Sequence, residues 1–81
     1  MNSFELLEKR SVVLRGRKTS ISLEKCFWEE LKRIAHERNL YIGELVAQIG
    51  EGHPHNLSSA VRQTVVADLK ARAFPVALEP A

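Results

Sequence analysis

The sequence contains little of what small proteins usually use to gain rigidity. It has one cysteine, Cys26, among 81 residues. A single cysteine excludes a disulfide within the chain and argues against a cysteine-based zinc site. A chain of this length buries only about 60–65% of the surface that its unfolded form exposes, so a monomer is marginally stable. We therefore expect a partner chain to supply the missing stability.

Segments that direct a chain to a membrane are also missing. No apolar run approaches the roughly 20 residues that a membrane span requires. Residues 1–8 include Glu5 and Glu8 and lack the basic start of a signal peptide. The composition, 44% hydrophobic and 27% charged, is that of an ordinary soluble globular domain. We therefore expect a cytoplasmic protein with no membrane contact.

The sequence lacks the motifs that carry most enzyme chemistry. It contains no nucleophile elbow, glycine-rich phosphate-binding loop, zinc signature or pair of inward-facing carboxylates. His53 and His55 have no third ligand pattern beside them, so residues 50–55 are predicted to be a loop. We therefore expect no catalysis, no cofactor and no bound metal ion.

Acidic residues are absent from residues 9–23. Five of the twelve basic residues lie there, so this segment carries +5 and the rest of the chain −3, within a total of +2. The five are Lys9, Arg10, Arg15, Arg17 and Lys18. A locally basic segment on a nearly neutral protein is either an anion-binding surface or a solvated basic arm. Composition alone leaves both alternatives open.

The basic segment has the pattern of a β-strand. One face of the alternation consists of Thr19, Ile21 and Leu23. The other face consists of Lys18, Ser20 and Ser22. The parity reverses at Gly16, where a bulge or a turn would change the phase of the strand. The pattern predicts a main strand over 17–23, and either an extension of it or a separate short strand over 11–15.

Three amphipathic segments follow the predicted strand. Apolar residues at three- and four-residue spacings predict helices over 24–38, over about 42–49, and from Asn56 or Ser58 to the Phe74-Pro75 pair. Ser22 is the predicted N-cap of the first helix. Opposite charges four residues apart are predicted to pair on exposed helix faces, and they include Arg33–Glu37 and Asp68–Arg72.

The predicted fold is mainly α with one short N-terminal β-strand. A lone strand leaves its backbone N–H and C=O groups without partners and exposes both of its edges. The same strand of a second chain can supply the missing partner by antiparallel pairing. This is a second reason, independent of chain length, to expect a homodimer.

The order strand, helix, short turn and helix resembles the ribbon-helix-helix fold of the Arc and methionine-repressor family of DNA-binding proteins. The resemblance rests on RKTSISLE at 17–24, FWEEL at 27–31 with the following Ile34 and Ala35, and NLYIGELV at 39–46. With NLSSAVR at 56–62, the chain resembles a subfamily of small bacterial proteins that have an extra C-terminal helix. The resemblance implies three regions. They are an N-terminal arm at 1–16, with or without a short extra strand; a ribbon-helix-helix domain with a third helix at 17–72; and a loose tail at 73–81.

The function that the resemblance implies is sequence-specific binding of double-stranded DNA by a transcriptional regulator such as a repressor. In the family, strands from two chains form a ribbon that enters the major groove, which is about 12 Å wide. The implied base-contacting residues are Lys18, Ser20 and Ser22. A lysine donates to guanine O6 or N7, whereas a serine hydroxyl donates or accepts and discriminates less sharply.

Phosphate contacts are implied at the N-terminus of the second helix, where backbone N–H groups attract anions, and in the basic segment. The implied residues are Arg15, Arg17, Tyr41, Ile42 and Gly43. The family usually has Ser or Thr at the cap position that Tyr41 occupies here. The implied dimer core consists of Ile21, Leu23, Phe27, Trp28, Leu31, Leu45, Val46 and Ile49.

An alternative function is an antitoxin or another protein-interaction module. In this hypothesis the same dimer holds a protein partner through its C-terminal region. The residues beyond the minimal fold favour it, as does the unusual Tyr41 cap.

Overall fold

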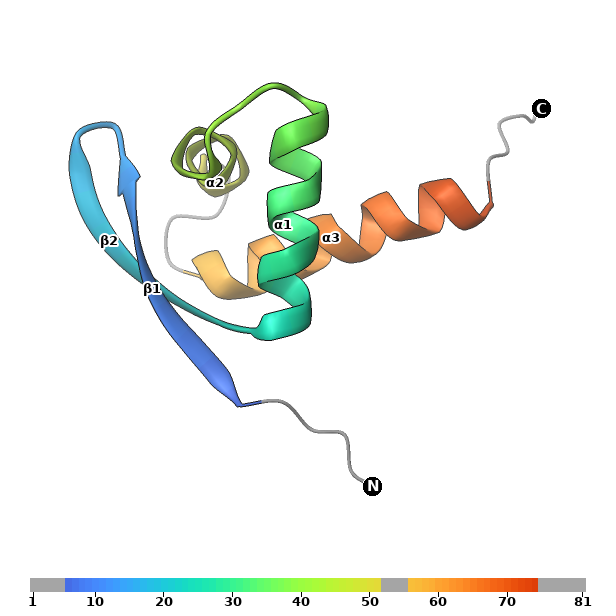
Figure 1. Cartoon of the computed structure of the whole chain (residues 1–81), viewed down its shortest axis with the longest axis horizontal. Coiled ribbons are helices and arrows are strands. Elements are labelled where there is room, and N and C mark those ends of the chain that lie inside the picture. The colour runs from blue at the N-terminus through green and yellow to red at the C-terminus, as the bar shows by residue number, and fades with distance from the viewer. Residues whose placement is uncertain (1–5, 52–55, 75–81) are drawn as a thin grey trace.

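The computed structural model describes residues 6–51 and 56–74. Two strands, β1 (Leu7–Leu14) and β2 (Arg17–Glu24), precede three helices, α1 (Lys25–Glu37), α2 (Ile42–Gly50) and α3 (Leu57–Ala73). The helices cover one side of the strands, and α3 runs past α1 and projects beyond it (Figure 1). The predicted ribbon-helix-helix order with an extra C-terminal helix is therefore confirmed. Of the predicted tail at 73–81, Ala73 belongs to α3 and Phe74 is its C-cap residue, and the rest lies outside the described residues. Of the predicted loop at 50–55, Gly50 belongs to α2, and residues 52–55 lie outside the described residues.

The strands form an antiparallel hairpin within the chain. Its register pairs Leu14 with Arg17 at the turn, and Leu7 with Glu24 at the opposite end. The turn residues Arg15 and Gly16 have φ angles of 51° and 83°. Positive φ at both central residues is what a two-residue turn between twisted strands requires. The turn lies where the alternation of the sequence reverses.

The hairpin differs from the predicted single strand that pairs with a second chain. β1 is eight residues long and begins at Leu7, within the predicted N-terminal arm. It pairs along the whole of β2, so β2 needs no second chain to satisfy that edge of its backbone. The local pattern concealed the first half of β1 because Glu8 and Arg10 occupy inward positions where apolar residues are expected.

Trp28 on α1 explains why charged residues are tolerated at those inward positions. Its side chain is 1% exposed, and its indole Nε1–H donates a hydrogen bond to the carbonyl oxygen of Glu8 at 2.9 Å. The guanidinium of Arg10 lies over the indole ring, 5.0 Å from its centroid, and 2.5 Å from a carboxylate oxygen of Glu8. An aromatic ring can pack against the stem of an arginine and attract its charge. These contacts fasten the first half of β1 to α1.

The core lies between the inner face of the hairpin and the three helices. Six of the eight residues predicted for a dimer core are buried by elements of this one chain, and the other two are half-buried. The buried ones are Ile21, Leu23, Trp28, Leu31, Leu45 and Val46, and the half-buried ones are Phe27 and Ile49. Val61 and Val65 of α3 complete the core. Burial of these side chains therefore does not depend on a second chain.

The end of β2 meets α1 and α3. Glu24 is the N-cap residue of α1, so the prediction that Ser22 caps this helix is wrong: β2 continues past Ser22. The Ser58 hydroxyl donates to the carbonyl oxygen of Ser22 at 3.1 Å, and the Arg62 guanidinium lies 2.9 Å from a carboxylate oxygen of Glu24.

None of the three helices is long and apolar enough to cross a membrane.

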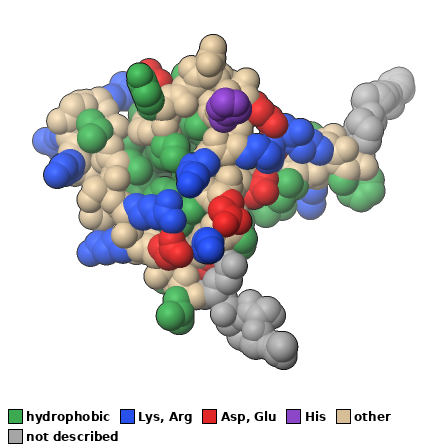
Figure 2. Space-filling view, in the orientation of Figure 1, with side chains coloured by type: hydrophobic (Ala, Val, Ile, Leu, Met, Phe, Trp, Pro, Cys, Tyr) green, Lys and Arg blue, Asp and Glu red, His purple; other side chains and the backbone are tan. Residues whose placement is uncertain are grey.

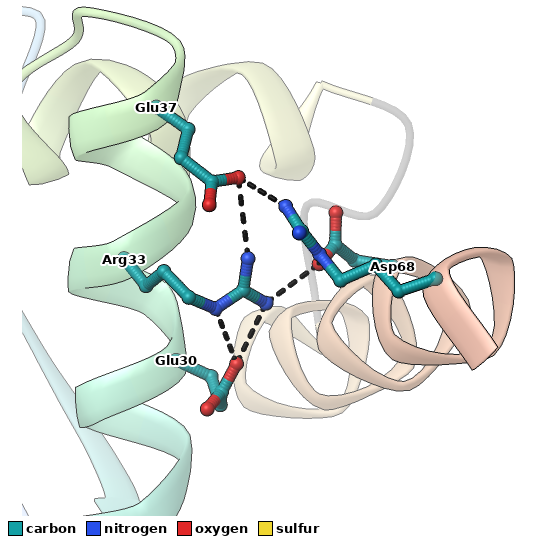
Figure 3. A network of polar contacts seen from close by, with 5 residues as sticks. Glu30, Arg33, Glu37 and Asp68 are labelled. Atoms are coloured by element: carbon teal, nitrogen blue, oxygen red, sulfur yellow. Dashed lines mark hydrogen bonds and ion pairs between the residues drawn. The ribbon is translucent and has the colours of Figure 1, made fainter.

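A network of ion pairs joins α3 to α1 (Figure 3). The Arg33 guanidinium lies 2.6 Å from a carboxylate oxygen of Glu30, 2.6 Å from one of Asp68 and 3.2 Å from one of Glu37. Arg72 pairs with Asp68 at 3.0 Å and also with Glu37. The Arg33–Glu37 and Asp68–Arg72 pairs were predicted from sequence spacing, whereas two other predicted pairs of the same spacing, Lys25–Glu29 and Glu29–Arg33, are not among the ion pairs of the described residues. The Arg33–Asp68 pair joins residues 35 positions apart, and no local sequence pattern predicts it.

The network makes the attachment of α3 sensitive to acid. The Arg33 guanidinium donates a hydrogen bond to Asp68 and, with Arg72, holds the pKa of the Asp68 carboxyl below its ordinary value. A depressed folded-state pKa contributes stability above the unfolded pKa, which is about 3.9 for Asp, and this stability is lost as the pH falls through the folded pKa.

We expect Asp68→Asn to lower the free energy of unfolding near pH 7 and to weaken its decline as the pH falls below about 4. The amide keeps the size of the side chain but removes the charge that titrates. Urea unfolding followed by circular dichroism at several pH values measures both effects. Glu29→Gln, an exposed carboxylate of α1 outside the network, is the control and should behave as wild type. Equal acid dependence in all three proteins would contradict the role of Asp68.

Candidate nucleic-acid interface

The hairpin face that points away from the helices carries two rows of side chains, which are polar except for Val13. The β2 row is Lys18, Ser20 and Ser22. The β1 row is Lys9, Ser11 and Val13. In the register the opposed pairs are Lys9 with Ser22, Ser11 with Ser20, and Val13 with Lys18. Because side chains alternate between the two faces of a sheet, all six lie on one side, which we call the outer ribbon face.

The outer ribbon face is largely exposed. Five of its six residues are exposed, and Ser22 is half-buried beside α3. The sequence pattern placed Lys18, Ser20 and Ser22 on one face, and the structure places them there together. Their contact with DNA stays a prediction. The β1 row was missed, although residues 9–14 (KRSVVL) and 18–23 (KTSISL) share the pattern Lys-x-Ser-[Val/Ile]-x-Leu, a signal that could have revealed it.

The five basic residues of the segment at 9–23 differ in their surroundings. Arg10 packs on the inner face, and Arg15 in the turn pairs with the carboxylate of Glu51. Within residues 6–51 and 56–74, no carboxylate pairs with the other three, which are Lys9, Arg17 and Lys18. Figure 2 shows Lys and Arg side chains gathered over the hairpin, on the left of the view. The local positive charge that the sequence indicates is therefore partly available to an anion.

One carboxylate, Glu24, lies at the foot of the outward side of β2, across from Leu7. The Arg62 guanidinium donates a hydrogen bond to it and keeps its pKa below the ordinary value. Arg62 also lies over the Phe27 ring, 5.7 Å from its centroid. The pairing balances the negative charge of Glu24, which would otherwise oppose an anion approaching the outer ribbon face.

The N-terminus of α2 holds three of the predicted phosphate-contacting residues. Tyr41 is the N-cap residue and its side chain is 82% exposed, while Ile42 is half-buried. The backbone N–H of Tyr41 donates to a carboxylate oxygen of Glu44 at 2.8 Å. An acidic side chain in the first turn stabilises the positive end of a helix. Glu44 therefore uses the Tyr41 N–H, one of the groups to which the resemblance assigns a phosphate contact.

Gly43 lets α2 approach the hairpin closely. A Cβ atom built on Gly43 would lie 2.2 Å from the carbonyl oxygen of Val13 in β1. No side chain fits at that distance, so the small size of Gly43 serves the contact between α2 and β1. Sequence reasoning expected a close approach of the backbone to DNA at this position, whereas the close neighbour in the structure is the strand of the same chain.

We expect Gly43→Ala to destabilise the fold by about 1–3 kcal/mol, because overpacking against a rigid backbone forces α2 and β1 apart. Urea unfolding measures the change. Gly50→Ala in the same helix is the matched control, since its added Cβ would meet only the flexible end of Leu57 at 3.0 Å. A Gly43→Ala protein as stable as Gly50→Ala would show that α2 does not need this approach.

The described part of the chain contains no group of three or more His, Cys, Asp or Glu side chains that could hold a metal ion. His53 and His55 lie outside the described residues, so the structure does not test the prediction made for them.

Comparison with known proteins identifies the family of the chain. The family model of the ribbon-helix-helix domain matches residues 7–69, from the first residue of β1 into α3. The match covers well over half of the chain, and the protein therefore belongs to the ribbon-helix-helix family. Neither the curated proteins nor the solved structures gave a match. Domains of this family are generally DNA-binding regulators.

Proposed function

We propose that the protein is a transcriptional regulator that binds double-stranded DNA with the outer ribbon face toward the bases of the major groove. The observation that carries this proposal is the exposed outer ribbon face, on which lysines and serines of both strands point toward the solvent. Membership of the ribbon-helix-helix family supports it, because such domains normally bind DNA as dimers.

The dimensions of the hairpin suit the groove. A two-stranded ribbon is narrow enough for the major groove, which is about 12 Å wide. Antiparallel strands rise about 3.4 Å per residue, so alternate side chains are about 6.8 Å apart. This separation equals about two steps of stacked base pairs. The β2 row of Lys18, Ser20 and Ser22 therefore spans about four base-pair steps.

Arginines of the turn are the proposed phosphate contacts beside the groove. Arg17 is exposed, and no carboxylate pairs with it in the described part of the chain. To bind a phosphate, the Arg15 guanidinium must leave the Glu51 carboxylate, but the side chains of this pair are 66% and 63% exposed. Such an exposed pair is worth at most about 1 kcal/mol, so a phosphate can replace the carboxylate at small cost. A phosphate contact from the Tyr41 N–H would first require the Glu44 carboxylate to move.

A homodimer is part of the proposal, and α3 offers a surface for it. Val66 and Leu69 are each 42% exposed and Phe74 is 73% exposed, unusual values for large apolar side chains. The same observation favours the alternative function, in which another protein occupies α3. The C-terminal half of α3, which carries these residues, projects away from the hairpin (Figure 1).

Lys18→Ala combined with Ser20→Ala should weaken the preference for a site selected from a random duplex library by about tenfold or more, and weaken sequence-independent binding much less. The variant loses a hydrogen-bond donor to guanine at the turn end of the β2 row and a hydroxyl at its centre. Fluorescence anisotropy at several salt concentrations measures both affinity and preference. Lys70→Ala, which removes an exposed lysine from α3, is the charge-matched control and should keep the preference. A wild-type protein with no affinity for duplex DNA at low salt would refute the proposal.

Lysine substitution of both Val66 and Leu69 should convert a dimer into a monomer without unfolding it. Two charges on the exposed apolar surface cannot be desolvated in an interface. Sedimentation equilibrium reports the mass, and circular dichroism reports the fold. Ala71→Lys, on another exposed side of α3, should remain dimeric. A double variant that stays dimeric would exclude α3 as the dimer surface, and a monomeric wild type would leave α3 to a different protein.

A further inference from the structure

We infer that each chain carries a complete ribbon with approximate two-fold symmetry, so that β1 is a second base-contacting strand and one hairpin recognises a short, imperfectly palindromic DNA site. This inference rests on the proposed DNA-binding function. It differs from the expectation that two identical strands from two chains build the ribbon. In place of the second chain, the β1 strand supplies Lys9, Ser11 and Val13.

The symmetry follows from the sequence and the register together. Residues 9–14 (KRSVVL) and 18–23 (KTSISL) match at four positions in identity or character, nine residues apart. The register pairs Ser11 directly with Ser20. A two-fold axis through the middle of this pair exchanges the strands, and it superimposes Lys9 on Lys18, Ser11 on Ser20, and Val13 on Ser22.

The inner face obeys the same symmetry. The axis superimposes Val12 on Ile21, which are both buried, and Leu14 on Leu23, which are half-buried and buried. These two pairs of apolar side chains face the core in matching positions, whereas Arg10 of β1 superimposes on Thr19 of β2 and departs from the symmetry. An antiparallel pair of identical strands from two chains would have this arrangement, and the hairpin achieves it with one chain.

Contacts within the chain hold β1 in place at both of its ends. Trp28 fastens the first half through the Glu8 carbonyl, and α2 lies against the second half where Gly43 meets the Val13 carbonyl. The two-residue turn fixes the register between these anchors. β1 is thus built into the same rigid unit as β2, and its outward row is as well placed for a ligand as that of β2.

The two lysines stand at opposite ends of the outer ribbon face. Lys9 lies across from Ser22 at the foot of the hairpin, and Lys18 lies across from Val13 near the turn. Four residues of strand separate these levels, about 14 Å at 3.4 Å per residue. That distance corresponds to about four base-pair steps, with the lysines on opposite strands of the ribbon. The symmetry of a DNA site mirrors the symmetry of the protein that binds it, so the lysines should favour guanines on opposite DNA strands.

Val13 and Ser22 break the symmetry. A valine offers an apolar contact to the methyl group of thymine, whereas a serine hydroxyl donates or accepts a hydrogen bond. The two halves of the site should therefore differ at the positions that face these residues. This difference between the strands sets the direction in which the hairpin lies on its site.

The test is selection of binding sites from a random duplex library, with wild type, Lys9→Ala, Lys18→Ala and Val13→Ser compared by sequencing. Within the part of the site that one hairpin covers, the wild-type protein should select an imperfect inverted repeat, in addition to any repeat that a dimer of two hairpins produces. Lys9→Ala and Lys18→Ala should each lose roughly tenfold or more of the preference at one of two symmetry-related positions. Val13→Ser makes the two outward rows identical and should make the selected site a more perfect palindrome. Ala71→Ser, which adds the same hydroxyl to an exposed position of α3 outside the apolar surface, is the control and should leave the site unchanged.

The outcomes separate this inference from the function on which it rests. If duplex DNA is bound and Lys18→Ala alters the site, but Lys9→Ala and Val13→Ser select the wild-type site, β1 does not contact bases and the inference is overturned while the proposed function stands. If no variant and no wild-type protein binds duplex DNA at low salt, the proposed function fails and the inference fails with it. Circular dichroism of each variant identifies any that have lost the fold, and Val13→Thr then repeats the test with a β-branched hydroxyl side chain.

Discussion

The register of the β1–β2 hairpin is the constraint on which the rest of the structure depends. The positive φ angles of Arg15 and Gly16 close the chain in a two-residue turn, and the turn aligns every pair of residues down to Leu7 and Glu24. A slip of one residue would exchange the two faces of a strand. Ile21 and Leu23 would then face water, and the serines of β2 would face the core. The apolar core and the polar outer face are two results of one register.

The helices hold this hairpin by different means. α1 uses a buried indole that donates to the backbone of β1, α2 approaches β1 where Gly43 has no side chain, and α3 binds the end of β2 through Ser58 and Arg62. The ion pairs around Arg33 then fix α3 on α1. One chain thus completes both a core and a ribbon. Association of two chains can therefore be governed by another surface, such as the exposed side of α3.

The sequence alone was sufficient for the parts of this structure that repeat with a local period. The alternation in β2, the reversal at Gly16 and the three helices follow from patterns a few residues long. A short strand over 11–15 was one of two alternatives, but the first half of β1 was missed because Glu8 and Arg10 interrupt its alternation, and only the distant Trp28 makes them acceptable inside. The pairing of Arg15 with Glu51 joins residues 36 positions apart, beyond the reach of any local pattern. The repeat of Lys-x-Ser at residues 9 and 18 gains its meaning once the turn sets the two copies antiparallel.

In the proposed complex, both strands of one hairpin present their outward residues to DNA. Amide chemical-shift mapping of the isotope-labelled protein, titrated with its selected duplex, locates this contact residue by residue. We expect the largest changes along both strands, at Lys9, Ser11 and Val13 as well as at Lys18, Ser20 and Ser22, with small changes along α3. Changes confined to β2, or concentrated on α3, would contradict it.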